Sequence, residues 1–347
     1  MAIYWLMFII PALGSLRNSS ARKFSRNHSS LVFLAIFFIF IVGLRFEVGC
    51  DWVNYLQHFY RATAINSYSD WEFVSSDIGF ALLNIFVSMI NGSHSGVNLI
   101  CALISVWGLY IFAKNQPTPL LAWTAAVPYI VIVLFQGYIR QATAFGVELL
   151  ALVVLSQAKY YRFVFLILLA ATFHKTALLL LPLAALSATN NKWWSYLWVG
   201  TTFMAAFSFF LQEYQDTLWN TYVVSDMASS GGGVRIAMNA TPAVLFLILK
   251  EKLVFQSRSE KKLWFWIAIL SLVCIPLVML SSTAADRIAL YFMPIQLFVF
   301  SRLPLMFPRN RQIITLAVVA YYATVQFVWL NYATHAFCWV PYDFQTL

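Results

Sequence analysis

Apolar runs long enough to cross a membrane follow one another along almost the whole of this 347-residue chain. A transmembrane helix needs about 20 predominantly apolar residues, whereas a soluble domain needs a polar surface. Here 61% of the residues are hydrophobic and 10% are charged, against about 25% charged residues in soluble domains. The chain is therefore predicted to be an all-α, polytopic membrane protein. A soluble enzyme, a disordered chain and a disulfide scaffold are excluded.

The apolar runs predict about 10–12 membrane helices in a single integral membrane domain, residues 1–347. The first run has no basic residues before it, so it is interpreted as a retained span and not as a secretory signal. Segment 78–90 is short for a span, so a re-entrant or interfacial helix is expected there. The run 163–187 is interrupted by His174-Lys175-Thr176, so a broken helix is expected in its middle. The runs are 2–16, 30–44, 78–90, 97–113, 119–137, 141–157, 163–187, 195–211, 241–249, 263–280, 288–301 and 312–332.

The net charge of +9 is distributed unevenly between these runs. Basic residues gather in the tracts 17–28, 250–262 and 302–311, which the positive-inside rule places in the cytoplasm. Acidic residues gather in 45–77 and within 212–240, so these two stretches are predicted to be outward-facing loops or amphipathic segments. No basic face of a soluble domain is visible, so the lipid bilayer is an expected partner and nucleic acid is not.

A few charged side chains interrupt the apolar runs, and they are the candidate functional residues. Charges inside a membrane are costly and usually serve a function. Arginine makes paired hydrogen bonds to phosphate oxygens, so several arginines at one membrane face indicate a lipid-linked phosphate or pyrophosphate. A nearby carboxylate or histidine is able to deprotonate an attacking hydroxyl. The residues are Arg45, Arg140, Glu148, His174 and Arg287.

Each of these residues also has a structural interpretation. An arginine at a helix end can extend to the membrane interface, and a histidine in an apolar run can be a packing residue. Asp51, in the acidic stretch after the second run, can cap a helix or pair with a neighbour. Glu148 lies two turns after Arg140 on the same helical face, which favours an ion pair over a catalytic role. The glycines before Arg235 form either a substrate-contacting hinge or a flexible linker. Neither a Cys/His metal spacing nor a P-loop is present, so no metal and no cofactor are predicted.

Four short motifs occur in order along the chain. The first is R-x3-G-x-D-x3-Y within residues 43–62, and the second is an Arg-Gln helix start in 139–152. The third is Phe-His-x-(Ser/Thr)-Ala-Leu in 168–182, and the fourth is Arg-x3-Tyr-Phe in 287–292. As an ordered set they resemble the EpsG-type, Wzy-like polymerases of O-antigen, capsule and exopolysaccharide. Cys50 and the segment from Asp77 to Phe80 depart from the family pattern, which bears on substrate details more than on the class.

The resemblance implies a metal-independent membrane glycosyltransferase with a GT-C-like helical fold. Such multi-pass proteins lie in the bacterial inner (cytoplasmic) membrane. They join undecaprenyl-pyrophosphate-linked oligosaccharide repeat units into a surface polysaccharide at its outer face. The lipid-linked oligosaccharides are therefore expected partners, together with a chain-length regulator and a flippase. Two other classes fit the same sequence: a flippase or transporter of lipid-linked sugars, which needs no base, and a membrane O-acyltransferase, which uses an intramembrane histidine.

The resemblance also gives roles to individual residues. Arg140 and Arg287 are expected to bind pyrophosphate, with Arg45 in support, because developing negative charge on a leaving oxygen calls for preorganised cations. Asp51 or His174 is the candidate base. All five are expected to line one cavity near the outer leaflet. Supporting contacts are expected from Tyr55, Gln141, Arg235 and Tyr291.

Overall fold

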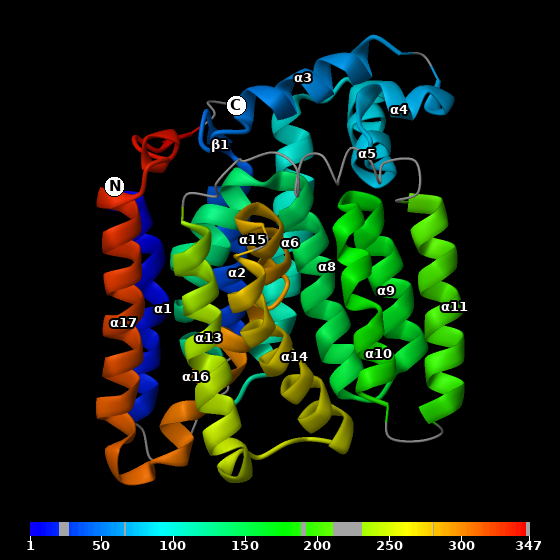
Figure 1. Ribbon diagram of the computed structural model, residues 1–347. Helices are drawn as coiled ribbons and strands as arrows, with labels where there is room; N and C mark the ends of the chain where they lie inside the picture. Colours follow the sequence, from blue (N-terminus) through cyan, green and yellow to red (C-terminus); the bar gives the residue numbers. More distant parts are fainter. Residues whose placement is uncertain (21–27, 66, 189–191, 211–230, 280, 345–347) are drawn as a thin grey trace.

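The chain is almost entirely helical, and its helices stand side by side in one bundle (Figure 1). The computed structural model describes residues 1–20, 28–65, 67–188, 192–210, 231–279 and 281–344. The helices of the bundle are α1 (Ala2–Ser20), α2 (His28–Gly43), α6 (His94–Lys114), α7 (Pro119–Ala126), the π-helix η2 (Val127–Phe135), α8 (Ile139–Ser156), α9 (Tyr160–Phe173), η3 (Lys175–Leu180), α10 (Pro182–Leu186), α11 (Lys192–Phe210), α13 (Gly232–Leu249), α14 (Arg258–Leu277), α15 (Ser282–Leu290), α16 (Pro294–Met306) and α17 (Arg311–Tyr332).

Short elements cover the two ends of this bundle. Figure 1 shows α3, α4, α5 and β1 together at the upper end, where the described C-terminal residues also lie. The short elements are β1 (Arg45–Phe46), α3 (Trp52–Thr63), η1 (Tyr68–Asp70), α4 (Trp71–Val74), α5 (Ile78–Met89), η6 (Lys250–Lys252), η7 (Pro308–Asn310), η8 (Ala336–Cys338) and β2 (Asp343–Phe344).

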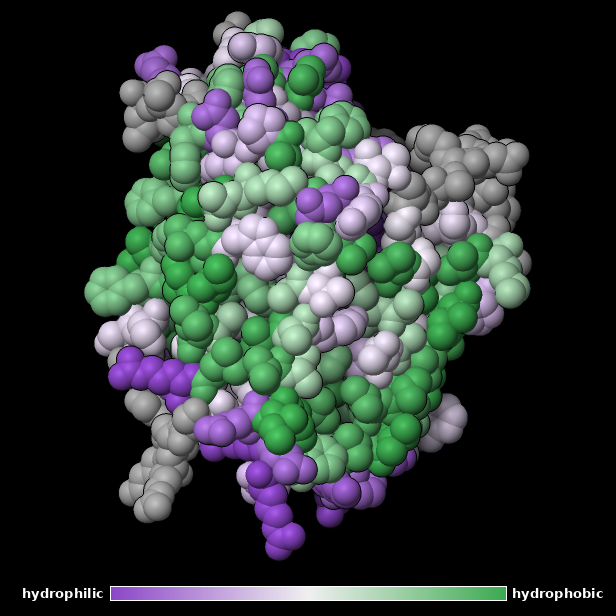
Figure 2. Space-filling view, turned by 90° about the vertical axis from the view of Figure 1, so that its left-hand side faces the viewer, coloured by the Kyte–Doolittle hydropathy of each residue, from purple (hydrophilic) through white to green (hydrophobic). Residues whose placement is uncertain are grey.

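Four described helical stretches are long and apolar enough to cross a membrane: His94–Lys114, Ile139–Ser156, Gly232–Lys252 and Pro308–Tyr332. There are up to six if each of two bent helix pairs counts as one span, and four shorter apolar helices of 10–17 residues stand beside them. Figure 2 shows a broad hydrophobic surface with hydrophilic side chains gathered toward the two ends. An all-α membrane fold with bent segments is therefore confirmed. The total of about 10–12 membrane helices also counts the shorter helices and stays a prediction.

Helices α6 and α8 approach each other closely at two glycines. A Cβ on Gly108 would lie 2.0 Å from the backbone oxygen of Gly146. In membrane bundles, small residues at an interface let two backbones come close enough for good van der Waals packing. This contact fixes α8, whose first residues carry the Arg-Gln motif, against the centre of the bundle.

Segment 78–90 turns back toward the end of the bundle from which it came. The axes of Tyr68–Val74 and Ile78–Met89 meet at 112°, and both helices lie beside α3 at the upper end (Figure 1). Phe80, Ala81 and Ile85 are buried, so α5 packs into the bundle on one side. This geometry agrees with the re-entrant helix that the short apolar run predicts.

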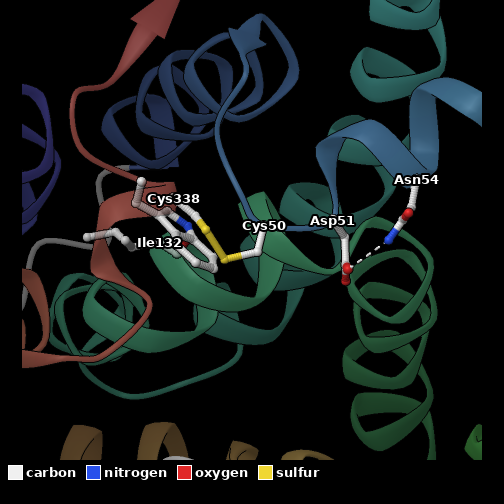
Figure 3. Close-up of a disulfide and its surroundings, with 6 residues drawn as sticks. Cys50, Asp51, Asn54, Ile132 and Cys338 are labelled. Carbon is white, nitrogen blue, oxygen red and sulfur yellow. Dashed lines mark hydrogen bonds between the residues drawn. A yellow bond between two sulfur atoms is a disulfide. The ribbon is translucent and has the colours of Figure 1, made fainter.

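A short C-terminal hook, residues 333–344, is tied to the same end of the bundle. Cys50 and Cys338 form a disulfide (Figure 3), and Gly49 N–H donates to the Cys338 carbonyl at 2.8 Å. Gly49 has φ +99°, and a Cβ there would lie 2.7 Å from the Gln136 oxygen, so the turn requires glycine. β1 and β2 pair antiparallel beside it. Sequence spacing alone did not reveal this disulfide.

The basic tracts gather at the end opposite the hook. The connections from α13 to α14 and from α16 to α17 lie at the lower end in Figure 1, and they contain the tracts 250–262 and 302–311. Most of the tract 17–28 lies outside the described residues, and so do residues 212–230 of the predicted loop 212–240. The rest of that loop is helical, since α13 begins at Gly232. The helix accommodates Arg235 because Asp286 neutralises its charge.

Candidate functional site

A polar break divides the long run 163–187. α9 ends at Phe173, His174 has an extended backbone, and a 3-10 helix begins at Lys175. The Asp77 carboxylate accepts a hydrogen bond from the backbone N–H of Lys175. Irregular backbone at membrane depth persists only where protein or water satisfies it. The break expected at this position is present, and Asp77 of the re-entrant segment stabilises it.

Arg140 lies beside the break at the start of α8. Its Nη1 is 2.7 Å from Oδ2 of Asp77, and its side chain also hydrogen-bonds to Tyr55 of α3. The Arg140 side chain is nevertheless 29% exposed, and its Nε has no hydrogen-bond partner among the described residues. Asp77 and Tyr55 therefore hold the guanidinium while part of the side chain stays exposed.

Helix α3 covers this site from the membrane surface. Tyr55 and Phe59 are its buried face, whereas Asp51 at its N-terminus is partly exposed. Burial lowers the pKa of the His58 imidazole, and the positive charge of Arg140 lowers it further. Helix α3 thus brings polar groups to the outer side of Arg140.

His174 is within electrostatic range of two arginines. Both Arg140 and Arg287 interact electrostatically with its imidazole. Its Nε2 is buried and has no hydrogen-bond partner within the described part of the chain. The structure therefore brings together three residues that are far apart in sequence, and it leaves a histidine nitrogen unused beside two cations.

Arg287 reaches this group from α15. Its Nη1 donates to Oε1 of Gln141 at 3.2 Å, and its guanidinium lies 5.2 Å from the centroid of the Tyr138 ring. Tyr291, one turn later, shares a 2.8 Å hydrogen bond with Thr176 of the broken segment. The Arg-Gln start of α8 and the late Arg-x3-Tyr motif are consequently in direct contact.

Arg235 lies next to this group and lines a cavity. Its Nη1 is 2.5 Å from Oδ1 of Asp286, and its guanidinium stacks 4.8 Å from the centre of the Tyr129 ring. The cavity, of about 560 Å³, is bounded by Arg235, Tyr138 and side chains of α13 and α17. Asp51, Arg140, His174 and Arg287 do not line it. The expectation of one cavity shared by five residues therefore does not hold for this cavity.

Asp51 lies at the edge of the site, beside the disulfide. Its Oδ1 accepts a 3.3 Å hydrogen bond from Asn54, as Figure 3 shows. It also interacts electrostatically with Tyr55, which links it to Arg140. Asp51 is thus near the arginine group without contacting His174 in any described interaction.

Arg45 differs from the other two motif arginines. It is 1% exposed, and its donors go to the backbone carbonyls of Val42 and Val48. Trp52 covers its guanidinium at 5.8 Å. Because its described hydrogen bonds brace the turn around β1, Arg45 is a structural residue here, and the expectation of pyrophosphate support is not favoured.

Glu148 does not pair with Arg140. The carboxylate beside Arg140 belongs to Asp77, whereas Glu148 is 0% exposed and neither of its oxygens has a hydrogen-bond partner among the described residues. The helical-face argument for a pair is wrong, since two turns of helix separate the side chains along the axis. Asp77 is the residue that sequence reasoning missed. Its position at the sharp bend before α5 is the signal that could have identified it.

Comparisons with known proteins bear on these observations. The model of the family described as the EpsG family matches residues 29–344, which is most of the chain. No curated protein and no solved structure matches. Among the described residues, no group of three or more His, Cys, Asp or Glu side chains is placed to hold a metal ion.

Proposed function

This chain belongs to the EpsG family of membrane proteins linked to exopolysaccharide biosynthesis, and we propose that it is a polysaccharide polymerase. Its substrates are undecaprenyl-pyrophosphate-linked oligosaccharide repeat units. Its location is the bacterial inner membrane, where a flippase supplies these units and a chain-length regulator acts beside it. The observation that carries the proposal is His174, which lies at a helix break and interacts electrostatically with both Arg140 and Arg287.

The two arginines suit the leaving group of this reaction. A new glycosidic bond forms between the anomeric carbon of the growing chain and a hydroxyl oxygen of the incoming unit. The bond from that carbon to the pyrophosphate oxygen breaks, and undecaprenyl pyrophosphate leaves with the bonding electrons. Arg140 and Arg287 stabilise the charge that develops on this oxygen. The partial exposure of the Arg140 side chain supports this role, because it leaves part of that side chain open to a phosphate while Asp77 and Tyr55 hold the rest.

A base takes the proton from the attacking hydroxyl. His174 is favoured over Asp51 because its Nε2 is unpartnered among the described residues and its imidazole interacts electrostatically with both arginines. Asp51 lies farther out and accepts from Asn54. On this assignment Asp77 is a positioning residue, since it acts on the reaction only through Arg140 and the Lys175 backbone.

The site is proposed to face the outside of the membrane. Disulfides persist in oxidising compartments such as the periplasm, and Cys50–Cys338 lies at the same end as α3. The basic tracts 250–262 and 302–311 lie at the other end, as the positive-inside rule requires. The test is Asp70→Cys in a chain that keeps the disulfide and carries Cys101→Ala and Cys274→Ala. We expect labelling by an impermeant maleimide from outside, and labelling only from the cytoplasm would contradict this orientation.

Activity is tested with the purified chain in liposomes and lipid-linked repeat units as the sole substrate. We expect products of two and more repeat units together with free undecaprenyl pyrophosphate. Movement of the units across the bilayer without lengthening would instead identify a transporter. Acyl transfer from an added thioester, again without lengthening, would identify an O-acyltransferase.

A further inference from the structure

The cavity beside Arg235 is built like a lateral pocket for a lipid. It lies between α13 and α17, both of which belong to stretches able to cross a membrane. Its walls are mostly apolar, and Val234, Val328 and Tyr332 on these walls are strongly exposed. Within a bilayer such side chains face hydrocarbon. An apolar chain can therefore enter from the side without crossing a polar surface.

A buried cation marks the inner end of this cavity. The Arg235 side chain is 8% exposed, and its Nε has no hydrogen-bond partner among the described residues. Asp286 engages Nη1 alone in the described ion pair, and Tyr129 covers one face of the guanidinium. An unused donor on a buried arginine in an apolar pocket fits the anionic head of an amphiphile.

The cavity also shares a wall with the proposed transfer site. Tyr138 lines the cavity and its ring lies against Arg287. Asp286, the partner of Arg235, directly precedes Arg287 in α15. A headgroup on Arg235 is thus one aromatic ring away from the arginines around His174.

We propose that this cavity is a lipid site, separate from the His174 break, which holds the polyprenyl chain of one lipid-linked substrate with its pyrophosphate on Arg235. This assignment rests on the proposed function. A reaction that joins two lipid-linked chains needs two places for lipid, and this cavity supplies one of them. Its shared wall with Arg287, the Tyr138 ring, favours a substrate over a bulk phospholipid, which would bring no sugar to the break.

The experiment uses the full chain in nanodiscs and a polyprenyl pyrophosphate that carries a diazirine on the chain. After irradiation, mass spectrometry maps the labelled peptides. We expect labelling in α13 and α17 that unlabelled polyprenyl pyrophosphate displaces and phosphatidylglycerol does not. Ala237→Trp fills the cavity from α13 and should lower labelling about tenfold. Ile248→Trp is the matched control, because Ile248 is exposed on the same helix outside the cavity and should leave labelling unchanged.

A second variant tests the headgroup contact. Arg235→Lys keeps a cation beside Asp286 but loses the planar donor pair, so probe affinity should fall about tenfold. Wild-type labelling in Ala237→Trp, or equal displacement by phosphatidylglycerol, would overturn the site. Chain lengthening is measured in the same nanodiscs. If the wild-type protein lengthens saccharide chains but its cavity is not labelled, the lipid site is refuted and the polymerase proposal stands. If the labelling is displaceable but no saccharide chain is lengthened, the lipid site is supported and the polymerase proposal is refuted.

Discussion

Two paired arginines near opposite ends of the bundle, one buried and one partly exposed, differ in how completely the protein uses their donors. Arg302 contacts Glu260 at 3.1 Å, donates to Gln116 and lies 3.6 Å from the Phe298 ring. Its side chain is 6% exposed. Arg140 has an ion pair with Asp77 and a bond to Tyr55, yet it is 29% exposed and its Nε lacks a partner among the described residues.

The difference separates a structural ion pair from one that can bind a ligand. A buried charge needs partners for its donors, and a network that is fully satisfied fixes one packing arrangement. The Arg302 network joins α16, α14 and Gln116 of the connection between α6 and α7, so it holds helices together. Arg140 pairs with Asp77 and Tyr55, but it is partly exposed and one of its nitrogens has no partner among the described residues. This is expected of a residue whose remaining contacts come from a substrate. Variants of the two residues should therefore fail in different ways.

Arg302→Ala should give the largest loss of stability. It leaves Glu260 buried without its cation, and breaking a buried pair costs about 3–5 kcal/mol of unfolding free energy. The measurement is denaturant unfolding in detergent. Adding Glu260→Gln removes the unpaired charge and should recover part of the loss. An Arg302→Ala protein as stable as wild type would show that the pair is not structural.

Arg140→Lys should act on rate instead. Lysine can still pair with Asp77, but it loses the planar grip on phosphate oxygens. Losing one preorganised donor costs about 2–4 kcal/mol of transition-state stabilisation, or about 30- to 1,000-fold in rate. Polymer yield is compared at equal amounts of folded protein. Wild-type chain lengthening by this variant would remove Arg140 from the reaction.

Joint replacement of Cys50 and Cys338 by serine tests the covalent tie at the outer end. The bond joins residues 288 positions apart, and losing a disulfide costs about 2–4 kcal/mol. The melting temperature in detergent should fall, and reduction of the wild-type protein should give the same fall. Cys274→Ala is the control, because Cys274 is a free cysteine. An unchanged melting temperature in the double variant would show that the hook does not stabilise the fold.

Glu148→Gln should have the smallest effect. Because Arg140 pairs with Asp77, the substitution leaves the arginine site intact, and the isosteric amide should change stability by about 1 kcal/mol or less. Asp77→Asn is the matched change at the true partner, and it should slow lengthening while Glu148→Gln does not. If the two variants slowed lengthening equally, Glu148 would belong to the site after all.

The sequence allowed the local features of the site to be predicted, but not its long-range pairs. The polar interruption at His174 predicted the break, because a run of that length cannot be one regular span with a His-Lys pair inside it. Asp77 was missed because only the bend before α5 brings it to Arg140. The pairing of Cys50 with Cys338 has no local signal either, since it depends on where the C-terminal hook packs.

The central claim is that the arginines around His174 act on a lipid-linked pyrophosphate while the Arg302 network only supports the fold. The most direct measurement compares chain lengthening by Arg140→Lys and Arg302→Lys in liposomes, with equal amounts of folded protein and defined lipid-linked repeat units. We expect the Arg302→Lys protein to make polymer at nearly the wild-type rate per folded molecule, and the Arg140→Lys protein to make about 30- to 1,000-fold less. Equal lengthening by the two variants, or none by the wild-type chain, would contradict the account.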